Sequence, residues 1–142
     1  MNRRLRHAGL GLLALSLVVT AAARAETATS IRSVTAADMQ WTNLRPGLDR
    51  VLLLGDPATS GPFVYRIRAP AGLDAGFHTH SADLNSTILS GAVIFEYDGE
   101  QHRLDAGSFV SVPANKPHRE LVVEATEMEV RGVGPVTTTP IE

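Results

Sequence analysis

The sequence contains no cysteine, few aromatic side chains and no run of basic residues. Without thiols the chain forms neither disulfide bonds nor thiolate metal sites, so any metal ion must be held by His, Asp, Glu or Asn side chains. Without a basic patch, the chain offers nucleic acid no electrostatic surface, and we expect no nucleic-acid partner. The candidate metal ligands are therefore the five histidines, the fifteen acidic residues and the asparagines.

Residues 1–25 have the composition of a secretory signal peptide. Arginines near the start precede an apolar run from about residue 10 to residue 23, and Ala23-Arg24-Ala25 is a small-x-small cleavage pattern. The apolar run is short for a membrane span, although an uncleaved anchor is the alternative. We therefore expect a periplasmic or secreted protein, with no membrane contact after cleavage. The remaining residues, nine Lys and Arg against fifteen Asp and Glu, carry a net charge of −6 and suffice for one domain.

Short apolar stretches separated by Gly, Pro and Asp-Gly turns fill the rest of the chain, and helical periodicity is almost absent. Such spacing predicts an all-β sandwich or small barrel. Expected strands cover residues 50–55, 63–69, 86–91, 92–97, 101–104, 107–113, 118–124 and 127–134. We expect an N-terminal arm and edge strands over 26–62, a barrel core over 63–134 and a tail over 135–142.

The stretch GFHTHSADLN, residues 76–85, carries two histidines one residue apart. On a strand, His78 and His80 point to the same face, about 6–7 Å apart along the chain, so both imidazoles can reach one ion. The alternative is a pair of ordinary surface histidines, and a third ligand from another strand is needed to decide. His118, after a strand and a Pro-containing turn, is the candidate.

These residues stand at the spacings of two sequence motifs of the cupin superfamily. The matching positions are Gly72, His78, His80 and Gly91 in the first motif, and Gly107, Pro113 and His118 in the second. Asn115 stands where the second motif usually has glycine, and asparagine tolerates the left-handed backbone that this position needs. The chain thus resembles a small single-domain cupin of the Cupin-2 or ChrR type. The resemblance implies a cupin double-stranded β-helix, a jelly-roll barrel, with His78, His80 and His118 as metal ligands.

The glutamate that is usual in the first motif is missing, because Leu84 occupies its place. Asp83 and Asn85 are neighbours with ligand atoms, but both point away from the face of position 84 unless a bulge turns them. Glu120 lies two residues after His118 and therefore on its face, an arrangement that resembles pirin, another member of the superfamily. We expect Glu120 as the fourth ligand, with Asn85 less favoured. The alternatives place Glu120 beside an imidazole N–H or in solvent.

Three imidazoles, with or without one carboxylate, suit one divalent first-row ion: Fe, Mn, Ni, Cu or Zn. The resemblance implies a metal-dependent, oxygenase-like enzyme acting on a small organic substrate. A non-catalytic cupin that binds or senses a metal or a small molecule is the alternative, and a vestigial site in a dimerising scaffold is a third. The resemblance also suggests a homodimer that exchanges edge strands through residues 31–54.

Overall fold

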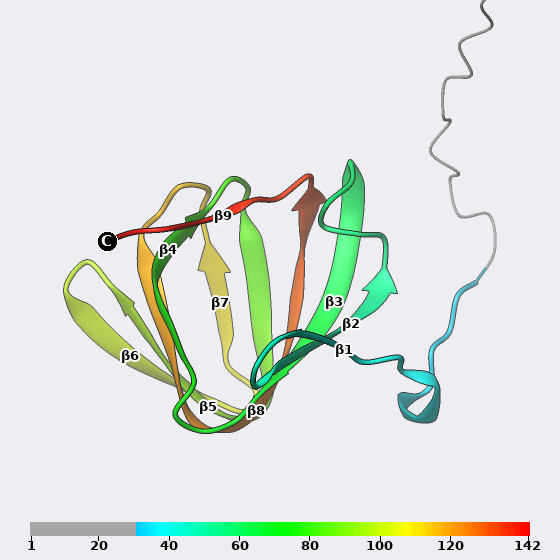
Figure 1. Cartoon of the computed structure of the whole chain (residues 1–142), viewed down its shortest axis with the longest axis horizontal. Helices are drawn as coiled ribbons and strands as arrows, with labels where there is room; N and C mark the ends of the chain where they lie inside the picture. Colours follow the sequence, from blue (N-terminus) through cyan, green and yellow to red (C-terminus); the bar gives the residue numbers. More distant parts are fainter. Residues whose placement is uncertain (1–30) are drawn as a thin grey trace, which may run out of the picture. The chain divides into compact units, whose positions relative to one another are not determined.

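Strands dominate residues 31–142, the part of the chain that the computed structural model describes (Figure 1). The predicted signal peptide, residues 1–25, lies outside the described residues. The strands are β1 (Thr42–Arg45), β2 (Leu48–Leu54), β3 (Gly61–Ala69), β4 (Asp74–His80), β5 (Leu84–Tyr97), β6 (Glu100–Asp105), β7 (Phe109–Val112), β8 (His118–Gly134) and β9 (Thr138–Pro140), after a single 3-10 turn, η1 (Ala36–Asp38). No helix within this range is long and apolar enough to cross a membrane.

The strands form one antiparallel sheet that curls around a core (Figure 1). Its main path runs β1-β2-β3-β8-β4-β9, and β5 pairs with β6, β7 and β8. The long strand β8 therefore touches β3, β4 and β5, and it joins the two faces of the barrel. This arrangement confirms the predicted all-β jelly-roll barrel.

The two longest strands are continuous where the sequence predicted interruptions. Residues 86–91 and 92–97 belong to the 14-residue β5, and residues 118–124 and 127–134 belong to the 17-residue β8. Gly91 does not end a strand. Its φ is 74°, and the β5–β8 register shifts on both sides of it, as in a β-bulge. A Cβ there would collide with the Ala125 carbonyl oxygen, so only glycine allows the two strands to pass at this distance.

The core fills the space between the two faces of the curled sheet. Its buried members are Phe63, Leu84, Ile88, Val93, Phe95, Val112, Met128 and Val130. They come from β3, β5, β7 and β8, and in β5 the bulge at Gly91 moves the buried positions from Leu84 and Ile88 to Val93 and Phe95. Phe77, by contrast, is 38% exposed. It neighbours His78 on a pleated strand, so the inward direction of His78 turns Phe77 outward.

The ends of the domain also join the sheet. Although residues 135–142 show no strand pattern, Thr138–Pro140 form β9, which pairs with residues 78–80 of β4. At the other end, β2 pairs with β3, and β1 folds back onto β2. Strand β9 therefore flanks β4, the strand that carries His78 and His80.

Candidate metal centre

The structure brings the three predicted histidines together. His78 and His80 come from β4 and His118 is the first residue of β8, where it stands directly opposite His78 in the antiparallel register. The ring centroids of His78 and His118 are 4.3 Å apart, and those of His80 lie 4.8 and 5.1 Å from the other two. One nitrogen of each ring lies within 4.8 Å of the others, so the group can hold a metal ion.

A tight turn before β8 sets the position of His118. Asn115 adopts the left-handed conformation, with φ of 61°, as the sequence predicted for this glycine position. Its N–H donates to the His80 carbonyl oxygen at 2.7 Å, which ties the turn to β4. Asp83 accepts a 2.7 Å hydrogen bond from the Ala114 N–H, so its carboxylate also holds this turn. These contacts place the end of one motif beside the histidines of the other.

Hydrogen bonds to the far side of the rings orient two of the three imidazoles. His78 Nδ1–H donates to the Gly76 carbonyl oxygen at 2.9 Å, and His118 Nδ1–H donates to the Lys116 carbonyl oxygen at 3.0 Å. A carbonyl oxygen only accepts, so Nδ1 carries a proton, and in the neutral form of each ring the lone pair is on Nε2. In the third ring, His80 Nδ1 lies 3.0 Å from the hydroxyl of Thr138 on β9.

The donor set fits a metal ion. His118 Nε2 is buried and has no hydrogen-bond partner among the described residues. A buried nitrogen without a partner is costly unless a ligand satisfies it. Its lone pair faces two further imidazoles rather than a donor, which is the environment of a metal ligand.

Electrostatics favour the neutral, metal-binding form of these rings. Burial lowers the pKa of His80 to about 4, and the neighbouring His78 and His118 add to the effect. Burial also lowers the pKa of His118, although its bond to the Lys116 carbonyl opposes this. Both rings are therefore unprotonated at neutral pH, as coordination requires.

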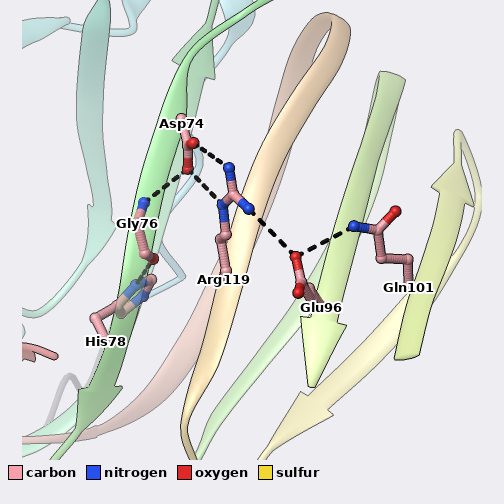
Figure 2. Close-up of polar contacts among 6 residues, drawn as sticks. All are labelled: Asp74, Gly76, His78, Glu96, Gln101 and Arg119. Carbon is pink, nitrogen blue, oxygen red and sulfur yellow. Dashed lines mark hydrogen bonds and ion pairs between the residues drawn. The ribbon is translucent and has the colours of Figure 1, made fainter. Parts of the chain in front are cut away.

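A polar network supports His78 from behind (Figure 2). The Gly76 N–H donates to Asp74 at 2.8 Å, so the peptide that accepts from His78 is itself held in place. Arg119 binds Asp74 through Nε at 3.0 Å and Glu96 through its other arm at 3.3 Å. Arg119 lowers the pKa of Asp74 to about 2, which keeps this carboxylate charged. The network links β4, β8 and β5 at the level of the histidines.

The histidines lie in the wall of a cavity of about 380 Å³. Glu120, Leu84 and Ser86 line the same cavity, whereas Asn85 does not, as strand parity predicted. Burial raises the pKa of Glu120, and the nearby His78 and Arg45 oppose that rise. Within the described residues, no carboxylate belongs to the group of ligand atoms that lie within 4.8 Å of one another.

Three further residues that line the cavity were not predicted from the sequence: Arg45, Arg50 and Tyr65. Burial raises the pKa of Tyr65 to about 12, and the charge of Glu120 adds to it. The parity of β3 contained a signal for Tyr65, because it shares a face with the buried Phe63. The two arginines gave no signal, since nothing local shows that the segment preceding the barrel lines its cavity.

The Cupin_2 family of sequences, described as the cupin domain, matches residues 65–132. This match spans both histidine motifs and the strands that carry them. The chain contains a small domain of the cupin superfamily.

Solved structures agree with this assignment at the level of the fold. A cupin of the RmlC-like type from Shewanella frigidimarina is 19% identical with a TM-score of 0.64, and the match covers 73% of this chain and 91% of that one. The polyketide cyclase RemF from Streptomyces resistomycificus is 12% identical with a TM-score of 0.70, over 80% and 87% of the two chains. Salicylate 1,2-dioxygenase from Pseudoaminobacter salicylatoxidans, in complex with gentisate, is 16% identical with a TM-score of 0.59, over 68% of this chain but only 30% of that one. No protein with a curated description matches the sequence.

In this cupin domain, Leu84 takes the position of the usual first-motif glutamate, and its side chain lies in an apolar environment. Leu84 is buried and packs in the core cluster, where it closes one side of the histidine cavity. A hydrocarbon side chain contributes no ligand atom, so the site has three histidines and an apolar wall. The acidic residue that lines this cavity is Glu120, on β8.

Proposed function

We propose that this cupin is an exported, metal-dependent, oxygenase-like enzyme that acts on a small organic substrate. The observation that carries this proposal is that three imidazoles converge in the wall of a cavity of small-molecule size. The ion is one divalent first-row metal: Fe, Mn, Ni, Cu or Zn. The composition of residues 1–25 supports export.

The residues of the cavity would have different roles. His78, His80 and His118 would hold the ion and leave other positions free for a substrate. The bound ion would supply Lewis-acid polarisation and, for a redox-active metal, electron transfer. Glu120, which lines the same cavity, would complete the coordination or accept a proton from the substrate. Apolar side chains such as Leu84 exclude water from this end of the cavity.

The structural neighbours support an enzyme of this broad kind without naming its reaction. They include a dioxygenase and a cyclase, both under 25% identical, so these two share the fold with this chain and not an established chemistry. The reaction class therefore rests on the site, and it has to be tested there.

Metal analysis and oxygen uptake test the proposal together. We expect protein purified without chelators to hold about one equivalent of a first-row metal, and the His118→Ala variant to hold far less. Fe(II)- or Mn(II)-loaded protein is then assayed in an oxygen electrode with a panel of phenols and enols. Metal-loaded protein that consumes no oxygen with any member of the panel would contradict the oxygenase proposal.

A second candidate is a cupin that binds a metal or a small molecule without turnover. The apolar Leu84 favours it, because redox chemistry depends more strictly on the full ligand set than binding does. This candidate predicts a stoichiometric metal ion and saturable ligand binding, with no product after prolonged incubation. A homodimer that pairs through residues 31–54 stays a prediction, which light scattering tests directly.

A further inference from the structure

Two arginines face the same cavity as the histidines. Arg45 ends β1 and Arg50 lies in β2, and the hairpin between them pairs with β3, the strand that carries Tyr65. Arg50 is half-buried and its guanidinium carbon is 5.8 Å from the centre of the Tyr65 ring, whereas Arg45 is exposed at the rim. Both side chains line the cavity. The hairpin therefore supplies one wall of the cavity and the metal-binding strands supply another.

Arg45 and Arg50 lack the acidic partners that four other arginines of the described residues have. Within residues 31–142, four arginines lie within 4.0 Å of a carboxylate oxygen: Arg66, Arg68, Arg103 and Arg119. Neither Arg45 nor Arg50 has such a partner in this part of the chain. Arg50 is half-buried and Arg45 is exposed, and each guanidinium presents a planar fork that matches a carboxylate.

The charges that line the cavity also favour binding of an anion. Its charged side chains are two arginines and a single acid, Glu120, so the cavity is cationic even when Glu120 is ionised. A bound divalent metal would add to that positive charge. An anion that entered would be attracted by the arginines and by the metal, and the low-dielectric walls would strengthen both interactions.

We propose that the substrate of this site is a small organic acid, with its carboxylate held by Arg45 and Arg50 and its reacting end at the histidines. This inference rests on the proposed metal-dependent function and names the substrate class for it. Between the two ends, the cavity is lined by apolar side chains such as Ile67, Met128 and Val130, which suit a ring or a short hydrocarbon body. The arginines are specificity determinants, because they distinguish the acid from a neutral molecule of the same shape.

A matched pair of probes tests the inference. 3,4-Dihydroxybenzoate and 3,4-dihydroxybenzamide share a metal-chelating catechol and differ in the charge at the far end. Each is titrated into Co(II)-loaded protein, followed by visible absorption, and into metal-free protein, followed by calorimetry. We expect wild type to bind the benzoate at least tenfold more tightly than the benzamide. In the Arg45→Gln/Arg50→Gln variant this preference falls to less than threefold, while affinity for the benzamide stays within twofold.

The control is Arg131→Gln, which removes one exposed positive charge of β8 outside the cavity and should keep the preference. Equal affinity of wild type for the two probes, or a preference that survives the double substitution, would overturn the inference. If wild type binds no cobalt but its metal-free form still prefers the benzoate through the two arginines, the metal-dependent function fails while the anion site stands. Circular dichroism confirms that each variant is folded.

Discussion

Asp74 and Arg119 form an ion pair between β4 and β8, directly behind the histidine pair that these strands place opposite each other (Figure 2). The pair reaches His78 through one peptide: Asp74 accepts from the Gly76 N–H, and the Gly76 carbonyl accepts from His78. The orientation of a candidate metal ligand thus depends on residues that do not touch the cavity. Such supporting contacts commonly change metal affinity by about 10–100-fold.

Replacing Asp74 tests this support. We expect Asp74→Ala to weaken metal binding about tenfold, because the Gly76 peptide and the His78 ring lose their fixed orientation. Competition with a chromophoric chelator measures the affinity. Asp105→Ala is the matched control, since Asp105 forms an exposed ion pair with Arg103 on β6, away from the cavity. Equal effects of the two substitutions would show that Asp74 acts only through general charge.

Glu120→Gln tests whether the missing carboxylate has moved to β8. The amide keeps the size of the side chain but is a much weaker metal ligand. We expect affinity to fall at least tenfold and the absorption spectrum of the Co(II) protein to change. Glu124→Gln, on the same strand but exposed, should change neither. An unaltered spectrum and affinity in Glu120→Gln would leave a site of three histidines.

The stability of the metal-free protein should depend on His80 in mildly acidic solution. Its pKa is about 4 in the folded protein and about 6.5 in the unfolded chain, so between these values the unfolded state binds the additional proton. Stability is therefore unaffected above about pH 7 and decreases as the pH falls towards 4. Because the ring is only half-buried, we expect a loss of about 1 kcal/mol from this group between pH 7.5 and 5.0.

Urea unfolding of wild type and His80→Asn at both pH values isolates that contribution. The variant lacks the titrating ring, so its loss between the two pH values should be smaller than that of wild type. A variant that loses as much stability as wild type would show that other groups control the acid sensitivity. Both proteins are treated with a chelator, because bound metal would itself stabilise the folded state.

The bulge at Gly91 predicts that alanine costs much more stability at this glycine than at Gly107. Gly91→Ala places a Cβ against the Ala125 carbonyl oxygen in a backbone with positive φ, and should cost about 3 kcal/mol or more. Gly107→Ala has the same backbone strain, with φ of 90°, but meets nothing within 4 Å, and should cost about 1 kcal/mol. If both variants lose the same free energy of unfolding in denaturant, the backbone has moved enough to relieve the collision with β8.

The sequence was sufficient for the features that depend on short spacings. The two-residue period of a strand placed His78 and His80 on one face, and it turned Asn85 away from the cavity. The motif spacing predicted the left-handed conformation of Asn115. Strand alternation and turn residues were enough for an all-β barrel. These are local properties, because the pleat repeats every two residues regardless of what the strand pairs with.

Tertiary structure alone decided what lies across the sheet. The register that sets His118 opposite His78, the contact of Thr138 with His80, and the arginines of the β1–β2 hairpin all depend on pairings between residues far apart in the chain. Local patterns also divided β5 and β8 into two strands each. In β5 the reason is Gly91, because a glycine bulge and a strand break look the same until the neighbouring strand is known. The sequence by itself identified the candidate ligand residues of this cupin, and the folded sheet determined which cavity surrounds them.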